Sequence, residues 1–91
     1  VARQDGPQAR LMLARVLERR RIPPEIGALR LLRFLTAATR IGTDKAVRVC
    51  MDAEVYRRDP RVRDLTLGER ARLAAVLRHR AEMAKAWRGA R

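Results

Sequence analysis

The chain has 91 residues, of which 47% are hydrophobic and 35% are charged, and its formal net charge is +12. This length suits one small domain with a modest core, and the apolar content is too high for a purely disordered basic tail. No apolar run has the length of a membrane span, and the single cysteine, Cys50, excludes an intramolecular disulfide. A pI of about 11.7 makes polyanions, above all nucleic acid, the expected partners.

The sequence offers no catalytic or metal-binding constellation. No spacing of cysteine, histidine or acidic residues matches a zinc or haem site, and nothing resembles a catalytic triad or a phosphate-binding glycine loop. Cys50 and the only histidine, His79, fall inside predicted helices, where a small buried cysteine and a surface histidine are the common case. We therefore expect a protein that is not an enzyme and that uses no metal or cofactor.

Helical spacing of apolar residues predicts an all-α domain of four helices. The first helix, over residues 7–20, begins at Pro7 and ends in the arginines Arg19 to Arg21. These cations favour the negative end of the helix dipole, and they can also hold phosphate, although a solvated helix end is the simpler interpretation. We predict that residues 1–21 form a basic helical extension to a domain over residues 22–91.

A second helix is predicted to begin at Pro24, after the break at Ile22-Pro23, and to end at Gly42. It is the most apolar element and should lie at the centre of the core. Its apolar face contains Ile26, Leu29, Leu32 and Phe34 or Leu35. Its exposed side should be positive, because Arg30, Arg33 and Arg40 point away from that face.

A third helix is predicted over about residues 43–57, capped by Thr43 or Asp44. Its core face contains Ala46, Val49, Cys50 and Ala53. Free amides at its start, with Lys45 and Arg48 close by, make a possible phosphate site. Taken alone, the pattern is better explained by Gly42 acting as an ordinary helix stop.

The connection to the last helix contains two local signals. Asp59 before Pro60 is expected to cap a short helical turn through Val62. Thr66 and Glu69 form the pattern of a capping box at the start of a long fourth helix, over about residues 67–88. The second half of that helix is too basic to be buried and is expected to project. Tyr56 and Trp87 can stack on bases, but packing against protein is the commoner role.

The run Arg61-Val62-Arg63-Asp64-Leu65-Thr66, followed by Glu69, is the most specific pattern in the chain. Further matching positions are Ile22-Pro23, Ile41-Gly42, Ala46, Val49-Cys50, Ala71, Leu73 and Leu77. Together they resemble the helix-two-turns-helix domain of the universal small-subunit ribosomal protein thirteen family. The resemblance covers about residues 22–80 and implies a small four-helix domain with a helix-two-turns-helix core and a long basic C-terminal helix.

The resemblance implies a structural constituent of the small ribosomal subunit that binds rRNA. It implies a place in the subunit head, near neighbouring ribosomal proteins and the bridge to the large subunit. The candidate RNA-binding residues are Arg40, Ile41, Gly42, Thr43, Lys45 and Arg48 at the first turn, and Arg61 and Arg63 at the second. The charge of the last helix adds Arg78, Arg80, Lys85 and Arg88.

The chain also departs from the family. Arg40 stands where glycine is usual, and the chain ends at Arg91 without the arginine- and glycine-rich tail that reaches tRNA in many members. We therefore expect no tRNA contact. These departures favour a divergent organellar form in the mitochondrial ribosome, with a bacterial or plastid ribosome as the alternative.

Two other classes of function stay open. A small basic DNA-binding helical protein, nucleoid or regulatory, would insert one helix into the major groove, but no predicted helix has a face of Asn or Gln to read bases. A protein-binding helical scaffold inside a large assembly would need no nucleic acid, and its binding would not change with salt.

Overall fold

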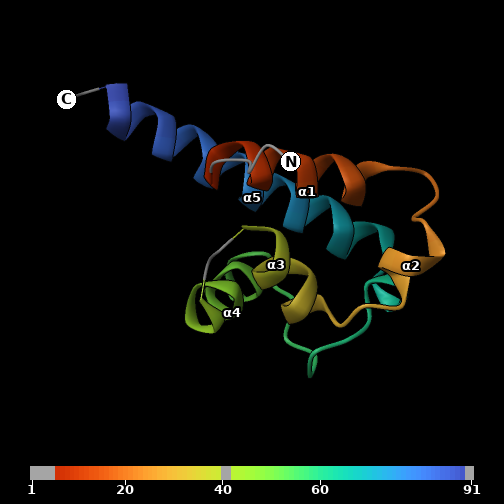
Figure 1. The fold of residues 1–91 in the computed structure, drawn as a ribbon. Helices are drawn as coiled ribbons and strands as arrows, with labels where there is room; N and C mark the ends of the chain where they lie inside the picture. Colours follow the sequence, from red (N-terminus) through yellow and green to blue (C-terminus); the bar gives the residue numbers. More distant parts are fainter. Residues whose placement is uncertain (1–5, 40–41, 90–91) are drawn as a thin grey trace.

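Residues 6–39 and 42–89 fold into five α-helices and one short 3-10 helix, which confirms the predicted all-α class (Figure 1). The computed structural model describes residues 6–39 and 42–89, without the side chains of residues 6–7, 38–39 and 84–89. The elements are α1 (Gly6–Glu18), α2 (Pro24–Gly27), α3 (Leu31–Thr39), α4 (Thr43–Asp52), η1 (Val62–Asp64) and α5 (Leu67–Gly89). The long last helix agrees with the prediction almost residue for residue.

Helices α1 and α5 lie side by side, and the C-terminal turns of α5 extend beyond the other elements (Figure 1). Leu13 and Leu17 of α1 are buried with Leu73 and Leu77 of α5. The Nε of Arg70 donates 3.0 Å to the carbonyl oxygen of Leu17, at the end of α1. Helix α1, which was predicted as an extension, therefore packs into the core that residues 22–89 form.

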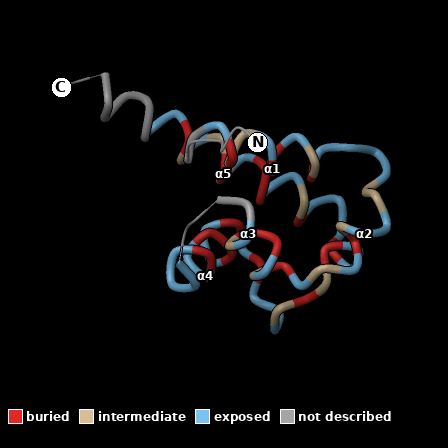
Figure 2. Tube along the Cα trace, in the orientation of Figure 1, coloured by how far each residue is buried: buried red, intermediate tan, exposed pale blue. Residues whose placement is uncertain are grey.

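One continuous core holds the helices together. Figure 2 shows that buried residues recur along α1, α3, α4 and α5, whereas α2 contributes Gly27. The largest fully buried side chains are Leu17, Val49, Leu31, Leu35, Val62, Leu73 and Leu77. They come from α1, α3, α4, η1 and α5, and each contributes roughly 1.5–3 kcal/mol by leaving water. The core is thus shared by elements from the whole sequence and not centred on α3 alone.

The predicted second helix is wrong in one respect, because it is broken between α2 and α3. Arg30, between the two helices, forms an antiparallel bridge with Arg61. The N–H of Leu31 donates 2.8 Å to the Pro60 carbonyl, and that of Val62 donates 2.9 Å to the Leu29 carbonyl. These bonds replace helical ones, so the chain between α2 and α3 runs beside the connection from α4 to α5.

Asp59 does not cap the short turn through Val62 as predicted. Its Oδ1 instead accepts a 3.0 Å hydrogen bond from the N–H of Leu32, in the first turn of α3. Helix η1 begins after Arg61 without a side-chain cap. Asp59 therefore satisfies one free donor at the start of α3, a helix that lies 27 residues earlier in the sequence.

Helix α4 is shorter than predicted and ends at Asp52, not near residue 57. The chain turns at Glu54, whose φ of 59° lies in the left-handed region, and the N–H of Val55 donates 2.8 Å to the Cys50 carbonyl. The predicted caps, Thr43 and Asp44, are also wrong: the capping position is Gly42, and no side chain bonds there. The predicted core face of α4 is confirmed, since Ala46, Val49, Cys50 and Ala53 are all buried.

Candidate nucleic-acid interface

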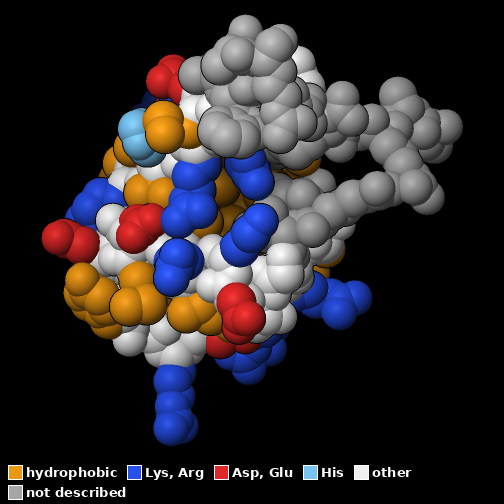
Figure 3. Space-filling view, turned by 90° about the vertical axis from the view of Figure 1, so that its left-hand side faces the viewer, with side chains coloured by type: hydrophobic (Ala, Val, Ile, Leu, Met, Phe, Trp, Pro, Cys, Tyr) orange, Lys and Arg blue, Asp and Glu red, His pale blue; other side chains and the backbone are white. Residues whose placement is uncertain are grey.

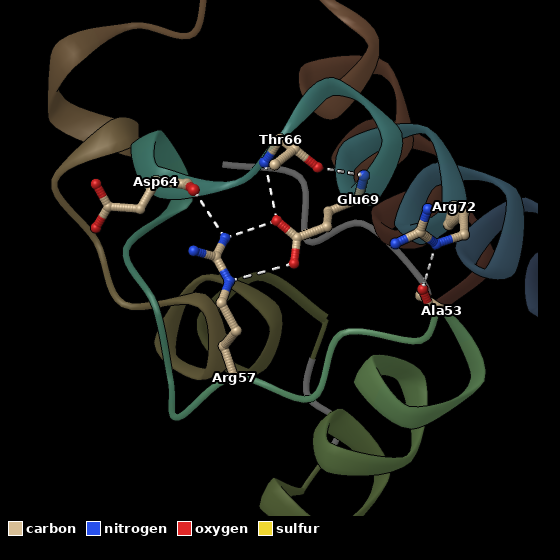
Figure 4. A network of polar contacts seen from close by, with 6 residues as sticks. All are labelled: Ala53, Arg57, Asp64, Thr66, Glu69 and Arg72. Atoms are coloured by element: carbon tan, nitrogen blue, oxygen red, sulfur yellow. Dashed lines mark hydrogen bonds and ion pairs between the residues drawn. The ribbon is translucent and has the colours of Figure 1, made fainter.

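The turn before α5 is fixed by a network of polar contacts around Glu69, whose residue is only 8% exposed (Figure 4). The N–H of Thr66 donates 2.9 Å to Glu69 Oε1, and the N–H of Glu69 donates 3.1 Å to Thr66 Oγ1. This confirms the predicted capping box. Arg57 adds a second partner, because its Nη2 donates 2.6 Å to Glu69 Oε1 and 2.7 Å to the Asp64 carbonyl. The Glu69 carboxylate thus binds the start of α5 directly. Through Arg57 it also connects that start to the loop after α4 and to the end of η1.

The ionised form of Glu69 is the favoured one in this network. Burial alone would raise the pKa of its carboxyl group, but the hydrogen bonds from Thr66 and Arg57 and the charge of Arg57 outweigh burial and lower the pKa. Arg57 is about half exposed, while the Glu69 side chain is largely covered. The sequence pattern revealed Thr66 and Glu69, but gave no signal for Arg57, which lies 12 residues from Glu69.

Several arginines in and after this connection donate to backbone carbonyls. Arg61 Nη1 donates 2.7 Å to Ala28, and Arg72 Nε donates 2.8 Å to Ala53 at the end of α4. Arg70 donates to Leu17 and Arg19 at the end of α1. These guanidinium groups satisfy carbonyls that helix ends leave without partners. They act first as structural ties, and Arg61, a predicted RNA contact, is one of them.

A second group of arginines has exposed side chains that make no hydrogen bond or ion pair with any described residue. We call Arg19, Arg20, Arg21 and Arg63 the arginine end. The first three follow α1, where Arg70 at the start of α5 binds the chain. Arg63 lies on η1, which packs so closely on α2 that a Cβ on Gly27 would be 3.2 Å from the Cβ of Arg63. These elements meet at one end of the molecule (Figure 1).

The predicted first-turn site lies at the start of α4. Gly42, Thr43, Lys45 and Arg48 are all exposed there, whereas Arg40 and Ile41 lie outside the described residues. Gly42 has φ −73° and ψ 167°, which any residue adopts, and a Cβ at this position would meet no atom within 4 Å. The backbone at the start of α4 is therefore open to a ligand, and glycine is not required for the turn.

The two predicted turns lie at opposite ends of α3. Gly42 follows its C-terminal end, while Arg61 pairs with Arg30 just before its N-terminal end. The nine residues of α3 span roughly 13 Å at 1.5 Å per residue. The structure thus separates the α4 start from the arginine end, and a ligand that touched both would have to be extended.

Two of the four predicted sites on α5, Arg78 and Arg80, are engaged within the fold. Arg78 pairs with Glu18 of α1, and Arg80 Nη2 lies 2.8 Å from Asp52 Oδ2 at the end of α4. The side chains of Lys85 and Arg88 lie outside the part that the structure describes. Basic and acidic side chains are mixed on the face seen in Figure 3. Arg78 and Arg80 are therefore weaker candidates for phosphate binding than the arginine end.

The two single residues singled out in the sequence are in the expected environments. Cys50 is buried, and burial, with a smaller effect of the Asp59 charge, raises the pKa of its thiol to about 11. His79 is exposed. Within residues 6–39 and 42–89, no group of three or more His, Cys, Asp or Glu side chains could hold a metal ion, and no helix is long and apolar enough to span a membrane.

The chain was also compared with known proteins. No family model, curated protein or solved structure matches it.

Proposed function

We propose that this chain binds the sugar–phosphate backbone of folded RNA, as a structural constituent of the small ribosomal subunit. The observation that carries this proposal is the arginine end: four exposed arginine side chains that have no partner among the described residues, on backbone that Arg70 and the Glu69 network hold in place. Arginine donates to phosphate in a bidentate manner, so such a surface binds backbone without reading sequence. The choice of rRNA, in the head near the inter-subunit bridge, rests on the resemblance around Arg61 to Glu69.

Rigidity is what would turn these charges into a selective surface. Arg70 ties the end of α1 to α5, and the Glu69 network fixes η1 against the start of α5. The arginines therefore project from backbone that changes little on binding, which lowers the entropy cost of association. RNA shape, that is the spacing of phosphates across a folded backbone, would then select the ligand. Lys45, Arg48 and the open backbone at Gly42 would supply a second set of contacts.

The test compares two double charge reversals on the full chain. Arg20→Glu with Arg63→Glu changes the arginine end, while Arg15→Glu with Arg33→Glu changes two exposed arginines elsewhere by the same total charge. We expect the first pair to weaken binding to a small-subunit rRNA head fragment at least roughly tenfold more than the second. Filter binding at several salt concentrations measures this. Equal losses would indicate a diffuse positive surface and contradict the proposal.

Duplex DNA is a second candidate ligand, since arginine and helix amides recognise phosphates that both nucleic acids carry. The exposed side of α4 contains Val47 and Met51, which are poor readers of base edges, together with Lys45 and Arg48, which can bind phosphate or guanine, and it has no Asn or Gln. We therefore favour a nucleoid protein that grips backbone over one that inserts α4 into the major groove. Competition between duplex DNA and the rRNA fragment at fixed salt separates the two candidates.

The proposed location is the mitochondrial ribosome. Co-sedimentation of the chain with small mitochondrial ribosomal subunits, retained through a moderate salt wash, is the expected result. If the chain associated only with bacterial or plastid subunits, the proposed location would be wrong but the proposed RNA-binding role would stand.

A further inference from the structure

An apolar groove of about 410 Å³ lies between α1, α2 and α3. Met12 and Val16 of α1 line one wall, Ile26 and Leu29 lie at and just beyond α2, and Phe34 and Ala37 of α3 complete it. Met12 is 48% exposed. Every described side chain that lines the groove is apolar, so it offers no hydrogen-bonding group that would orient a small polar ligand.

A second groove, of about 290 Å³, differs from the first because charged side chains contribute to its lining. It lies between α3, α4 and the loop after α4, and its lining includes Arg57 and Asp59. Both are already engaged: Arg57 binds Glu69, and Asp59 binds the N–H of Leu32. Arg57 and Asp59 of the second groove thus stabilise the fold itself. The apolar groove between α1, α2 and α3 contains no such internal hydrogen bonds among its described lining side chains.

Basic side chains flank the apolar groove. On α1, Arg15 follows the groove residue Met12 by three positions, so it lies next to the groove on the helical surface. On the other wall, Arg33 precedes Ala37 by four positions. Both side chains are exposed and make no hydrogen bond or ion pair with a described residue. The nearest acidic side chain by sequence is Glu25, beside Ile26.

We propose that this groove docks an acidic amphipathic helix of a partner protein. From Ala9 to Val16 the groove wall spans eight residues, a rise of roughly 10 Å, which matches the i to i+7 span of apolar anchors on a docked helix. Acidic residues on both flanks of that helix would meet Arg15 on one side and Arg33 on the other. A second copy of this chain is a poor occupant, because a net charge of +12 on each copy opposes self-association.

The proposal does not depend on nucleic-acid binding. Arg15 and Arg33 lie outside the arginine end, and the apolar residues of the groove take no part in the RNA surface proposed above. The same charge-reversal variants therefore serve as reciprocal controls for the two ideas. The groove would join the chain to a neighbouring protein, while the arginine end holds RNA.

The probe is a synthetic helical peptide of about 18 residues, with leucines at i, i+3, i+4 and i+7 and glutamates on both flanks. A scrambled peptide of the same composition, and an amphipathic peptide with lysine flanks, are its controls. Titration calorimetry should show that the first peptide binds the full chain at least roughly tenfold more tightly than either control. The scrambled peptide measures the nonspecific attraction of a basic chain for acidic ones.

Variants locate the binding. Met12→Asp should lower affinity for the acidic amphipathic peptide at least roughly tenfold, while Met51→Asp, a matched change in the other groove, should not. Arg15→Glu with Arg33→Glu should weaken binding more than Arg20→Glu with Arg63→Glu. Circular dichroism melts confirm that each variant is folded; because Met12 is half exposed, Met12→Asp should keep the fold.

Three results would each overturn the proposal. Equal affinity for the scrambled and the amphipathic acidic peptides would show that charge alone accounts for binding. Equal affinity for the lysine-flanked and the glutamate-flanked peptides would show that the arginines beside the groove do not contribute to binding. Sedimentation showing a dimer of the chain that Met12→Asp dissociates would make a second copy the occupant.

Discussion

The two long connections of the fold, residues 19–30 and residues 53–66, are both rich in arginine but use it differently. In the later connection Arg57 and Arg61 donate to backbone carbonyls, and Arg57 also holds Glu69. In the earlier one, the side chains of Arg19 to Arg21 are exposed and have no hydrogen-bond or ion-pair partner among the described residues, as is also true of Arg63 in the later connection. The difference shows that the position of free carbonyls, and not the number of charges, decides which arginines are available to a ligand.

The largest expected effect distinguishes the arginines with free side chains from those that bond to carbonyls. It is the effect of each group on how affinity for nucleic acid depends on salt. Replacing Arg19, Arg20 and Arg21 by glutamine should lower affinity for nucleic acid by roughly 100-fold, because about three phosphate contacts are lost. The slope of log affinity against log salt should fall by roughly 2 to 3. The free energy of unfolding should change by less than about 0.5 kcal/mol, since these side chains tie nothing. Salt titrations and urea unfolding measure the two quantities.

The matched variant replaces Arg57, Arg61 and Arg72 by glutamine, which removes the same charge. It should show the reverse pattern, a clear loss of stability and a smaller change in the salt slope. If both triple variants change the slope equally and leave stability alone, the distinction between tying and free arginines is lost.

The next effect concerns Glu69. Glu69→Gln should lower the free energy of unfolding by roughly 2 kcal/mol at neutral pH, because the charged partner of Arg57 is removed while the side-chain shape is kept. The folded-state pKa of Glu69 is lowered, so its contribution is complete above the ordinary glutamate pKa of about 4.3. That contribution disappears as pH falls through the lowered pKa, and the two proteins should become equally stable in strong acid.

Urea unfolding at neutral and acidic pH checks this convergence. Glu25→Gln is the control, since Glu25 is exposed and makes no hydrogen bond or ion pair with any described residue. If the difference in free energy of unfolding between wild type and Glu69→Gln stayed constant down to strong acid, the charge of the carboxylate would not be what stabilises the contact with Arg57.

A smaller effect is expected at Glu54, where the chain leaves α4 with φ 59°. Glu54→Gly should raise the free energy of unfolding by up to about 1 kcal/mol, because glycine adopts this conformation without the strain of a Cβ. Glu54→Gln separates that gain from the removal of a negative charge near a helix C-terminus. Thermal melts of the three proteins give the comparison, and an equal gain in both variants would assign the effect to charge alone.

Local signals were sufficient for part of this structure. The capping box of Thr66 and Glu69 and the extent of α5 involve residues three or four apart, and both were predicted. The break before Leu31 was not, because it is stabilised by Pro60 and Arg61, some 30 residues away. For the same reason, Asp59 was assigned to the wrong turn. Helical periodicity describes one element at a time and cannot show which distant backbone will compete for its hydrogen bonds.

The candidate site divides in the same way. Exposure at Gly42, Thr43, Lys45, Arg48 and Arg63 followed from their positions in turns and on helix faces. The pairing of Arg61, Arg78 and Arg80 did not, since each partner lies on another element: Ala28, Glu18 and Asp52. The separation of the α4 start from the arginine end also depends on how α3 is placed between them.

The smallest effect tests whether phosphate approaches the backbone at the start of α4. Gly42→Ala should leave the melting temperature unchanged, because φ is negative there and the added methyl group meets no atom within 4 Å. Gly27→Ala should lower stability slightly, because its methyl group would lie 3.2 Å from the Cβ of Arg63 and η1 would have to shift by a few tenths of an ångström. If RNA backbone contacts the first-turn amides, Gly42→Ala should weaken binding severalfold, but less than roughly tenfold, while the fold is unaffected. Unchanged affinity would confine the interface to the arginine end and exclude the start of α4 from RNA binding.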